Sequence, residues 1–122
     1  MTDKEKGFLG EEIAAEFLQS KGLEILERNY VTRGGELDII AKDGETLVFV
    51  EVKTRLGTDF PGAEAMDEKK ISFMLRCAER YVLDKKDLAS DMKSRFDFVE
   101  ICFEDGRFNG KPKIIHSTNI IF

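Results

Sequence analysis

The sequence predicts an α/β fold with the element order α-β-β-β-α-β-β. Two segments repeat apolar residues at the spacing of a helix, and five others read as strands. The 122 residues can bury one hydrophobic core and are too few for two. We therefore expect a single domain over residues 1–122.

The chain begins with a predicted helix and a predicted strand. Apolar residues recur at helical spacing within residues 4–21, and Gly22 follows as a helix stop. Residues 23–31 then carry Leu23 and Ile25 on one side of an extended segment. The N-terminal quarter of the chain is therefore expected to form one helix followed by one strand.

A β-hairpin is predicted after the break at Gly34-Gly35. Residues 36–42 and 45–53 form two strands around Asp43-Gly44, a dipeptide typical of hairpin turns. Placing this dipeptide at the centre of the turn sets the register of the two strands. The expected pairs are Lys42 with Glu45, Ile40 with Leu47, Asp38 with Phe49 and Glu36 with Glu51.

The second half of the chain supplies the remaining helix and strands. A loop over residues 56–65 follows the hairpin, and apolar residues then recur at helical spacing from 71 to 82. Residues 95–104 alternate as a strand, Asp105-Gly106 forms a turn, and residues 113–116 supply a short last strand. The predicted chain order is then complete.

Composition excludes a membrane protein and limits the possible partners. No stretch approaches the roughly 18 consecutive apolar residues that a membrane span needs, and the N-terminus mixes both signs of charge. We therefore expect a cytoplasmic protein with no membrane partner. The formal net charge of −5 argues against nonspecific nucleic-acid binding, which relies on clustered lysine and arginine.

The cysteines and the histidine limit the kind of metal site. Cys77 and Cys102 lie far apart in apolar surroundings, so we expect two buried free thiols. His116 is the only histidine, and one chain therefore lacks the nitrogen and sulfur ligands of a zinc site. Any metal ion is expected to be held by oxygen atoms.

Carboxylates gather at one end of the predicted hairpin. Strand alternation puts Glu51 and Lys53 on one face, and the expected register puts Asp38 diagonal to Glu51 at roughly 7 to 8 Å. Such a pair of carboxylates suits Mg²⁺ (or Mn²⁺), and the Val52 carbonyl is a further expected ligand. Lys53 is expected to stabilise negative charge near the ion, and Glu36 is a possible additional member of the site.

The same charges have a simpler interpretation. Charged residues commonly line the solvated face of an antiparallel hairpin without any further role. This face also carries Ile40, Leu47 and Phe49, so its middle is expected to be buried and the charges to cluster at its end. Both interpretations remain open on these residues alone.

The spacing of these residues resembles a nuclease signature. Asp38 followed by Glu51-Val52-Lys53 resembles the PD-(D/E)xK motif, in which an acidic residue precedes (D/E)-x-K on the next strand. Other runs along the chain resemble the YraN family of small bacterial proteins, which are similar to archaeal Holliday-junction resolvases. These runs are residues 10–14, 28–30, 35–40, 48–55 and 95–97.

The resemblance implies a restriction-endonuclease-like core, with a central mixed sheet flanked by helices. It also implies a Mg²⁺-dependent endonuclease that acts on structured or branched DNA. By motif position, Asp38 and Glu51 would bind the metal and Lys53 would be the catalytic lysine. Glu11 would be the acidic residue that resolvases carry on a helix. A plain first-turn charge that favours the helix dipole is the alternative for Glu11.

Partners and rival functions follow from the same residues. Arg55, Lys69 and Lys70 are expected to contact nucleic acid as part of a basic track that continues to Arg76 and Arg80 on the second helix. A homodimer is expected because a junction has two arms to cleave symmetrically. The alternatives are a non-catalytic nucleic-acid-binding module of the same fold and a protein-interaction domain.

Overall fold

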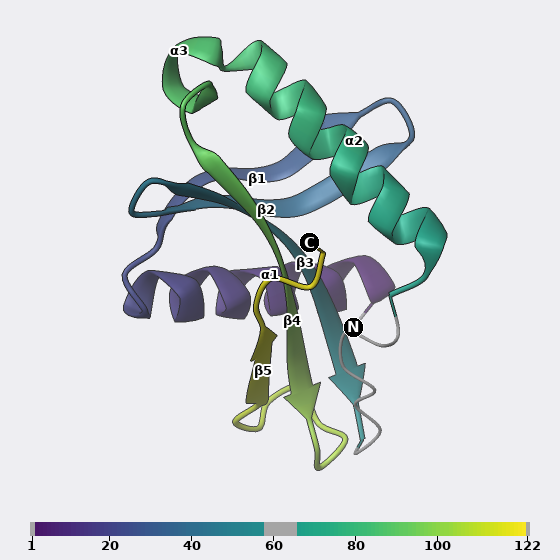
Figure 1. Ribbon diagram of the computed structural model, residues 1–122. Coiled ribbons are helices and arrows are strands. Elements are labelled where there is room, and N and C mark those ends of the chain that lie inside the picture. The colour runs from purple at the N-terminus through teal and green to yellow at the C-terminus, as the bar shows by residue number, and fades with distance from the viewer. Residues whose placement is uncertain (1, 58–65, 122) are drawn as a thin grey trace.

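Five strands form one mixed sheet with a long helix on each face (Figure 1). The structure is a computed structural model that describes residues 2–57 and 66–121. The elements in chain order are α1 (Asp3–Ser20), β1 (Glu24–Thr32), β2 (Gly35–Asp43), β3 (Thr46–Leu56), α2 (Glu68–Asp84), α3 (Lys86–Ala89), β4 (Lys93–Phe103) and β5 (Lys113–Ser117).

This order confirms the predicted fold class, with one added helix and some shifted element ends. The short helix α3 was not predicted, and α2 begins three residues earlier than its apolar pattern. β3 continues to Leu56, three residues past its predicted end. Most of the predicted loop over residues 56–65 lies outside the described residues. Among the described helices, none is long and apolar enough to cross a membrane.

The strands lie in the sheet in the order in which they occur in the chain. β3 pairs with β4 in parallel, and every other neighbouring pair is antiparallel. A parallel pair needs a long crossover connection, which α2 provides. This connection carries α2 across the sheet face opposite α1, so side chains from β2, β3 and α2 can meet on one side.

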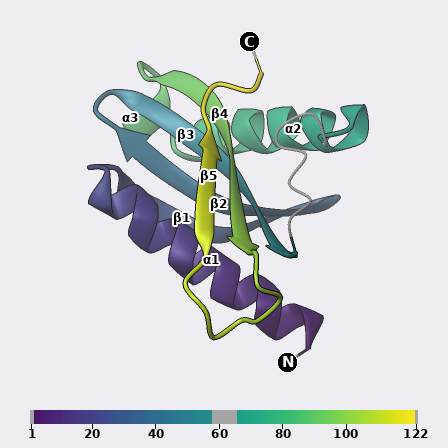
Figure 2. The same ribbon diagram turned by 90° about the horizontal axis from the view of Figure 1, so that it is seen from below.

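The two faces of the sheet bury separate hydrophobic clusters, and Figure 2 shows α1 and α2 on opposite sides of the strands. Ala14 and Leu18 of α1 pack on one face, and Met74 and Tyr81 of α2 pack on the other. Both cysteines are free and buried, as predicted. The alternation of the central strands supplies apolar side chains to both clusters.

The predicted register of the β2–β3 hairpin was wrong by two residues. The strands close at Asp43 and Thr46, so Gly44 and Glu45 form the centre of the turn. Gly44 has a φ of +59° and Glu45 is not in the positive-φ region, the pattern of a turn with glycine at its first central position. A shift of two residues keeps the side chains of the paired segments, residues 39–43 and 46–50, on their predicted faces. Among the observed pairs are Lys42 with Leu47 and Ile40 with Phe49.

Gly10 lets α1 approach β3 closely. A Cβ atom at Gly10 would overlap Thr54 Oγ1 and lie 3.1 Å from Thr54 Cβ. We expect Gly10→Ala to lower the free energy of unfolding by about 1 to 3 kcal/mol, as overpacking does. Gly7→Ala on the same helix meets open space and should raise stability by about 0.5 to 1 kcal/mol. Urea denaturation of both variants tests this contact, and equal effects would contradict it.

Candidate functional site

A polar pocket opens where β2, β3 and the start of α2 meet. Its volume is about 380 Å³. Asp38 comes from β2, the Glu51-Val52-Lys53 run from β3, and Lys70 from α2. The structure therefore brings the predicted motif residues to one place. The pocket is lined by Asp38, Glu51, Val52, Lys53, Arg55, Met66, Asp67, Lys70 and Phe98.

Asp38 lies where the regular alternation of β2 is broken. Leu37 and Ile40 pack in the cluster under α2, whereas Ile39 packs in the cluster under α1. Strict alternation would put Leu37 and Ile39 on the same face. Asn29, level with Asp38 on β1, has a φ of +53°. The strand pair is thus distorted at the point where Asp38 enters the pocket.

The Asp38 carboxylate replaces part of the β2–β3 hydrogen-bond ladder. The described pairing of the two strands ends at Ile39 and Val50, and the Val52 N–H then donates to Asp38 Oδ2 at 2.8 Å. Burial raises the pKa of Asp38 above its ordinary value, although this hydrogen bond and the charges of Lys70 and Lys53 lower it. A partly desolvated carboxylate of this kind gains from a nearby cation.

Glu51 is the buried carboxylate of the pocket. It is 7% exposed and forms an ion pair with Lys70, which reaches it from the first turn of α2. Asp67 begins this helix by accepting a hydrogen bond from the Lys70 N–H at 2.7 Å. The helix start thus fixes the lysine that balances Glu51.

The donors around the pocket suit a hard divalent ion. Within residues 2–57 and 66–121, no three His, Cys, Asp or Glu side chains form a ligand cluster. The available oxygen donors are the carboxylates of Asp38 and Glu51 and the main chain of Val52. Mg²⁺ is commonly held by one or two carboxylates and keeps several water ligands, so this donor set fits it.

Glu11 and Glu36 lie beside this pocket and do not line it. Glu11 Oε1 accepts a hydrogen bond from Asn29 Nδ2 at 2.6 Å. Burial raises the pKa of Glu11, the Asn29 hydrogen bond lowers it, and the Asp38 charge raises it, which puts Glu11 within electrostatic reach of the site. Glu36 lines a neighbouring pocket together with Lys69 and Lys70.

The three residues predicted to contact nucleic acid occupy different surroundings. Arg55 lines the motif pocket, and its Nε donates to Glu100 Oε2 at 2.7 Å. Glu100 is fully buried, so Arg55 also neutralises an internal charge. Lys69 is exposed in the neighbouring pocket, and Lys70 borders both pockets. Lysine side chains thus extend from the motif pocket along α2.

Several contacts of the site, and the residues Asn29 and Asp67, were not predicted from the sequence. The Lys70 to Glu51 ion pair and the Asn29 to Glu11 hydrogen bond join segments that are far apart in the chain. Their residue types carry no local signal of such contacts. Asp67 was detectable, because aspartate before Glu68 is a typical helix N-cap.

Removing the charge of Asp38 is expected to stabilise the metal-free protein. Asp38→Asn keeps an oxygen for the Val52 N–H and removes a carboxylate whose pKa is raised by burial. We expect the melting temperature in EDTA at pH 7 to rise by about 3 to 6 °C, or about 1 kcal/mol.

The stability gained by Asp38→Asn is expected to depend on pH, because the pKa of Asp38 is raised in the folded protein. A raised folded-state pKa means that protonated Asp38 favours folding, and this contribution is lost as the pH rises through the folded pKa. The advantage of Asp38→Asn should therefore vanish below the ordinary aspartyl pKa of 3.8. Asp87→Asn on the exposed surface is the control. A destabilised Asp38→Asn protein at pH 7 would contradict this account.

Comparison with known proteins identifies the family. A sequence profile described as uncharacterised protein family UPF0102 matches residues 10–101, which include Asp38, Glu51 and Lys53. A UPF0102 protein of Syntrophomonas wolfei is 42% identical over 118 residues, covering 96% of this chain and 97% of that protein. UPF0102 proteins of Dictyoglomus thermophilum and Caldicellulosiruptor saccharolyticus are 46% and 47% identical over 102 residues, covering 83% of this chain and 85% of each protein. The chain therefore belongs to the uncharacterised protein family UPF0102, the family of the YraN proteins.

Proposed function

We propose that this protein is a Mg²⁺-dependent endonuclease of the PD-(D/E)xK type that hydrolyses phosphodiester bonds in structured or branched DNA. The observation that carries the proposal is the shared pocket of Asp38, Glu51 and Lys53. A buried and a half-buried carboxylate in one pocket cost stability unless cations neutralise them, and their place beside the exposed Lys53 suits phosphodiester chemistry.

Asp38 and Glu51 would hold the divalent ion, and the Val52 carbonyl would be its third protein ligand. The ion supplies charge that polarises the phosphate and lowers the pKa of water. Asp38 is kept in place by the Val52 N–H, which fixes one carboxylate oxygen and leaves the other for the pocket. Glu51 is held in the same pocket as Asp38 by its position on β3.

The two lysines carry the positive charge that the phosphate meets. Lys53 is exposed at the pocket and stabilises the negative charge that develops on the phosphate oxygens. Lys70 pairs with Glu51 in the described state and has to release that carboxylate before it can act as a ligand. The released ammonium then lies beside the pocket, where it can contact a phosphate.

Glu11 acts through its charge and is not a ligand of the metal ion. Its hydrogen bond from Asn29 holds it near Asp38, where its charge adds to the attraction for a cation. Arg55, Lys69 and Lys70 contact the backbone of the substrate. The enzyme acts as a homodimer, because symmetric cleavage of two arms of a junction requires two identical active sites.

Nuclease assays test the proposal. The purified chain is incubated with a four-way junction, the matched duplex and single-stranded DNA, with Mg²⁺, with Mn²⁺ or with EDTA. We expect cleavage of the junction with either ion and none with EDTA. Absence of cleavage of every substrate would reject the enzymatic function, and metal-independent binding without cleavage would favour a non-catalytic binding module.

A further inference from the structure

We propose that a cleft between α2 and the β1–β2 turn is a second phosphate-binding site, in which Arg33, Arg76 and Arg80 hold the backbone of the bound nucleic acid away from the cleavage pocket. This inference rests on the proposed function for the class of ligand. The cleft has a volume of about 660 Å³. It is lined by Tyr30, Val31, Thr32, Arg33, Arg76, Arg80 and Asp84.

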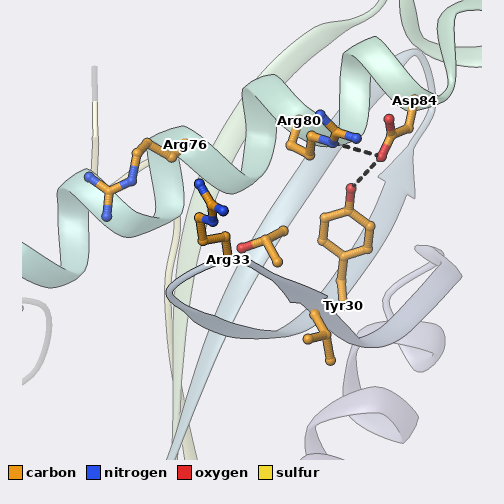
Figure 3. A pocket seen from close by; sticks show the side chains of 7 residues that line it. Tyr30, Arg33, Arg76, Arg80 and Asp84 are labelled. Carbon is orange, nitrogen blue, oxygen red and sulfur yellow. Dashed lines mark hydrogen bonds and ion pairs between the residues drawn. The ribbon is translucent and has the colours of Figure 1, made fainter.

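The arginines of the cleft come from two segments that are far apart in the sequence. Arg33 stands in the turn after β1, and Arg76 and Arg80 are one helical turn apart on α2. Figure 3 shows Arg33 rising from the turn toward α2, Arg80 reaching toward Asp84, and Arg76 extending from the helix away from Arg80. The fold thus gathers three guanidinium groups around one opening.

Two of the three guanidinium groups form no ion pair with a carboxylate among the described residues. Within residues 2–57 and 66–121, neither Arg33 nor Arg76 has a carboxylate within 4.0 Å. Both residues are exposed. Arginine carries its charge at every physiological pH, so the cleft is positive although the whole chain has a net charge of −5.

Arg80 is positioned by a hydrogen-bonded group at the end of the cleft. Its Nε donates to Asp84 Oδ2 at 3.3 Å, and the Tyr30 hydroxyl donates to the same oxygen at 3.1 Å (Figure 3). Burial and the Asp84 carboxylate raise the pKa of Tyr30 to about 12, so Tyr30 stays protonated and remains a donor. Asp84 uses one guanidinium nitrogen and leaves the others for a ligand.

The chemistry of the cleft matches a phosphodiester better than other ligands. Guanidinium groups bind phosphate oxygens through paired N–H donors, and an open, solvated cleft suits a chain that enters and leaves it. Tyr30 is the one aromatic residue among those that line the cleft, and its ring packs against Tyr81 instead of facing a base. The contact is therefore to the backbone and carries no base recognition.

The cleft and the cleavage pocket are joined along α2. A third pocket lies between the turn after β1 and the start of α2. It is lined by Gly34, Gly35, Glu36, Asp67, Lys69, Lys70 and Phe73. From Lys70 the helix rises about 9 Å to Arg76 and about 15 Å to Arg80. One strand of duplex DNA advances about 3.4 Å per nucleotide, so this length spans roughly three to four nucleotides.

Binding assays in EDTA test the cleft without hydrolysis. The probe is a fluorescein-labelled four-way junction, and its affinity for the chain is measured by anisotropy over a range of salt concentrations. We expect the double variant Arg33→Gln, Arg76→Gln to bind at least about tenfold more weakly. The slope of log K against log salt should fall by about 1 for each phosphate that the variant no longer neutralises.

Arg107→Gln provides the matched control. Arg107 is exposed on the β4–β5 connection, at the end of the sheet away from α2 in Figure 1. This variant should bind like the parent. Unchanged affinity and salt slope in the double variant would overturn the proposal, and so would binding of inorganic phosphate at the cleft without binding of the junction.

The outcome is separable from that of the nuclease assay. Binding that depends on Arg33 and Arg76 in a chain that never cleaves DNA would support the cleft and reject the hydrolase. If the parent cleaves DNA and the double variant binds and cleaves like the parent, the proposed nuclease activity is supported and the proposed phosphate site in the cleft is rejected. Thermal melting of the variants confirms that each is folded, as expected for exposed side chains.

Discussion

Lys53→Met is expected to reduce the rate of DNA cleavage roughly 100-fold while leaving the affinity for Mn²⁺ unchanged. Lys53 lines the pocket beside Asp38 and is exposed to a substrate. In the proposed mechanism its ammonium stabilises charge on the phosphate and does not hold the ion. Glu51→Gln, in contrast, should lose both cleavage and Mn²⁺ affinity, because it removes a ligand.

Rates on the labelled junction and Mn²⁺ titration by calorimetry separate these two roles. Lys111→Met is the control for removal of a positive charge, since Lys111 is exposed on the β4–β5 connection. Asp87→Asn is the control for removal of a carboxylate. Equal loss of metal affinity in Lys53→Met and Glu51→Gln would contradict the division of roles.

Asp97→Ala is expected to lower the free energy of unfolding by about 3 kcal/mol, the largest effect on stability that we expect. Asp97 is fully buried on β4 and accepts hydrogen bonds from Arg95, from His116 Nε2 at 2.8 Å and from the Asn119 N–H at 3.0 Å. The substitution leaves these donors without their shared acceptor. Urea denaturation at pH 7 measures the loss, with Asp87→Ala as the exposed control.

The same cluster predicts how stability depends on pH. Burial acts to raise the pKa of Asp97, but the hydrogen bonds from His116, Arg95 and Asn119 outweigh it and hold the pKa below its ordinary value of 3.8. Ionised Asp97 therefore stabilises the fold above that value, and this stability is lost as the pH falls through the folded pKa. A parent protein and an Asp97→Asn variant with the same acid transition would contradict this role.

The fold was predictable where the apolar pattern of a segment matches the face that the segment buries. The apolar periods of α1 and α2 and the alternation of β2 and β3 gave the element order, because each period matches the face that the element buries. The hairpin register was not predictable from the Asp43-Gly44 dipeptide, since Gly44 suits either central position of a turn. The short helix α3 has no apolar period of its own.

The motif residues of the candidate site were predictable from the sequence, and their contacts with the rest of the fold were not. Alternation predicted that Asp38 and Glu51 share one face, and both residues line one pocket in the structure. The break in alternation at Asp38 and the partnership of Glu51 with Lys70 depend on contacts between distant segments. The basic track along α2 to Arg76 and Arg80 was predicted. The place of Arg33 in the same cleft was not, because Arg33 meets α2 only through the fold.

A crystal structure of the protein soaked in Mn²⁺, with anomalous diffraction at the manganese edge, tests the central claim most directly. The proposed function predicts one anomalous peak that touches a carboxylate oxygen of Asp38 and one of Glu51, with Lys70 displaced from Glu51. A peak bound to only one of the two carboxylates, or no peak in this pocket at saturating Mn²⁺, would contradict it.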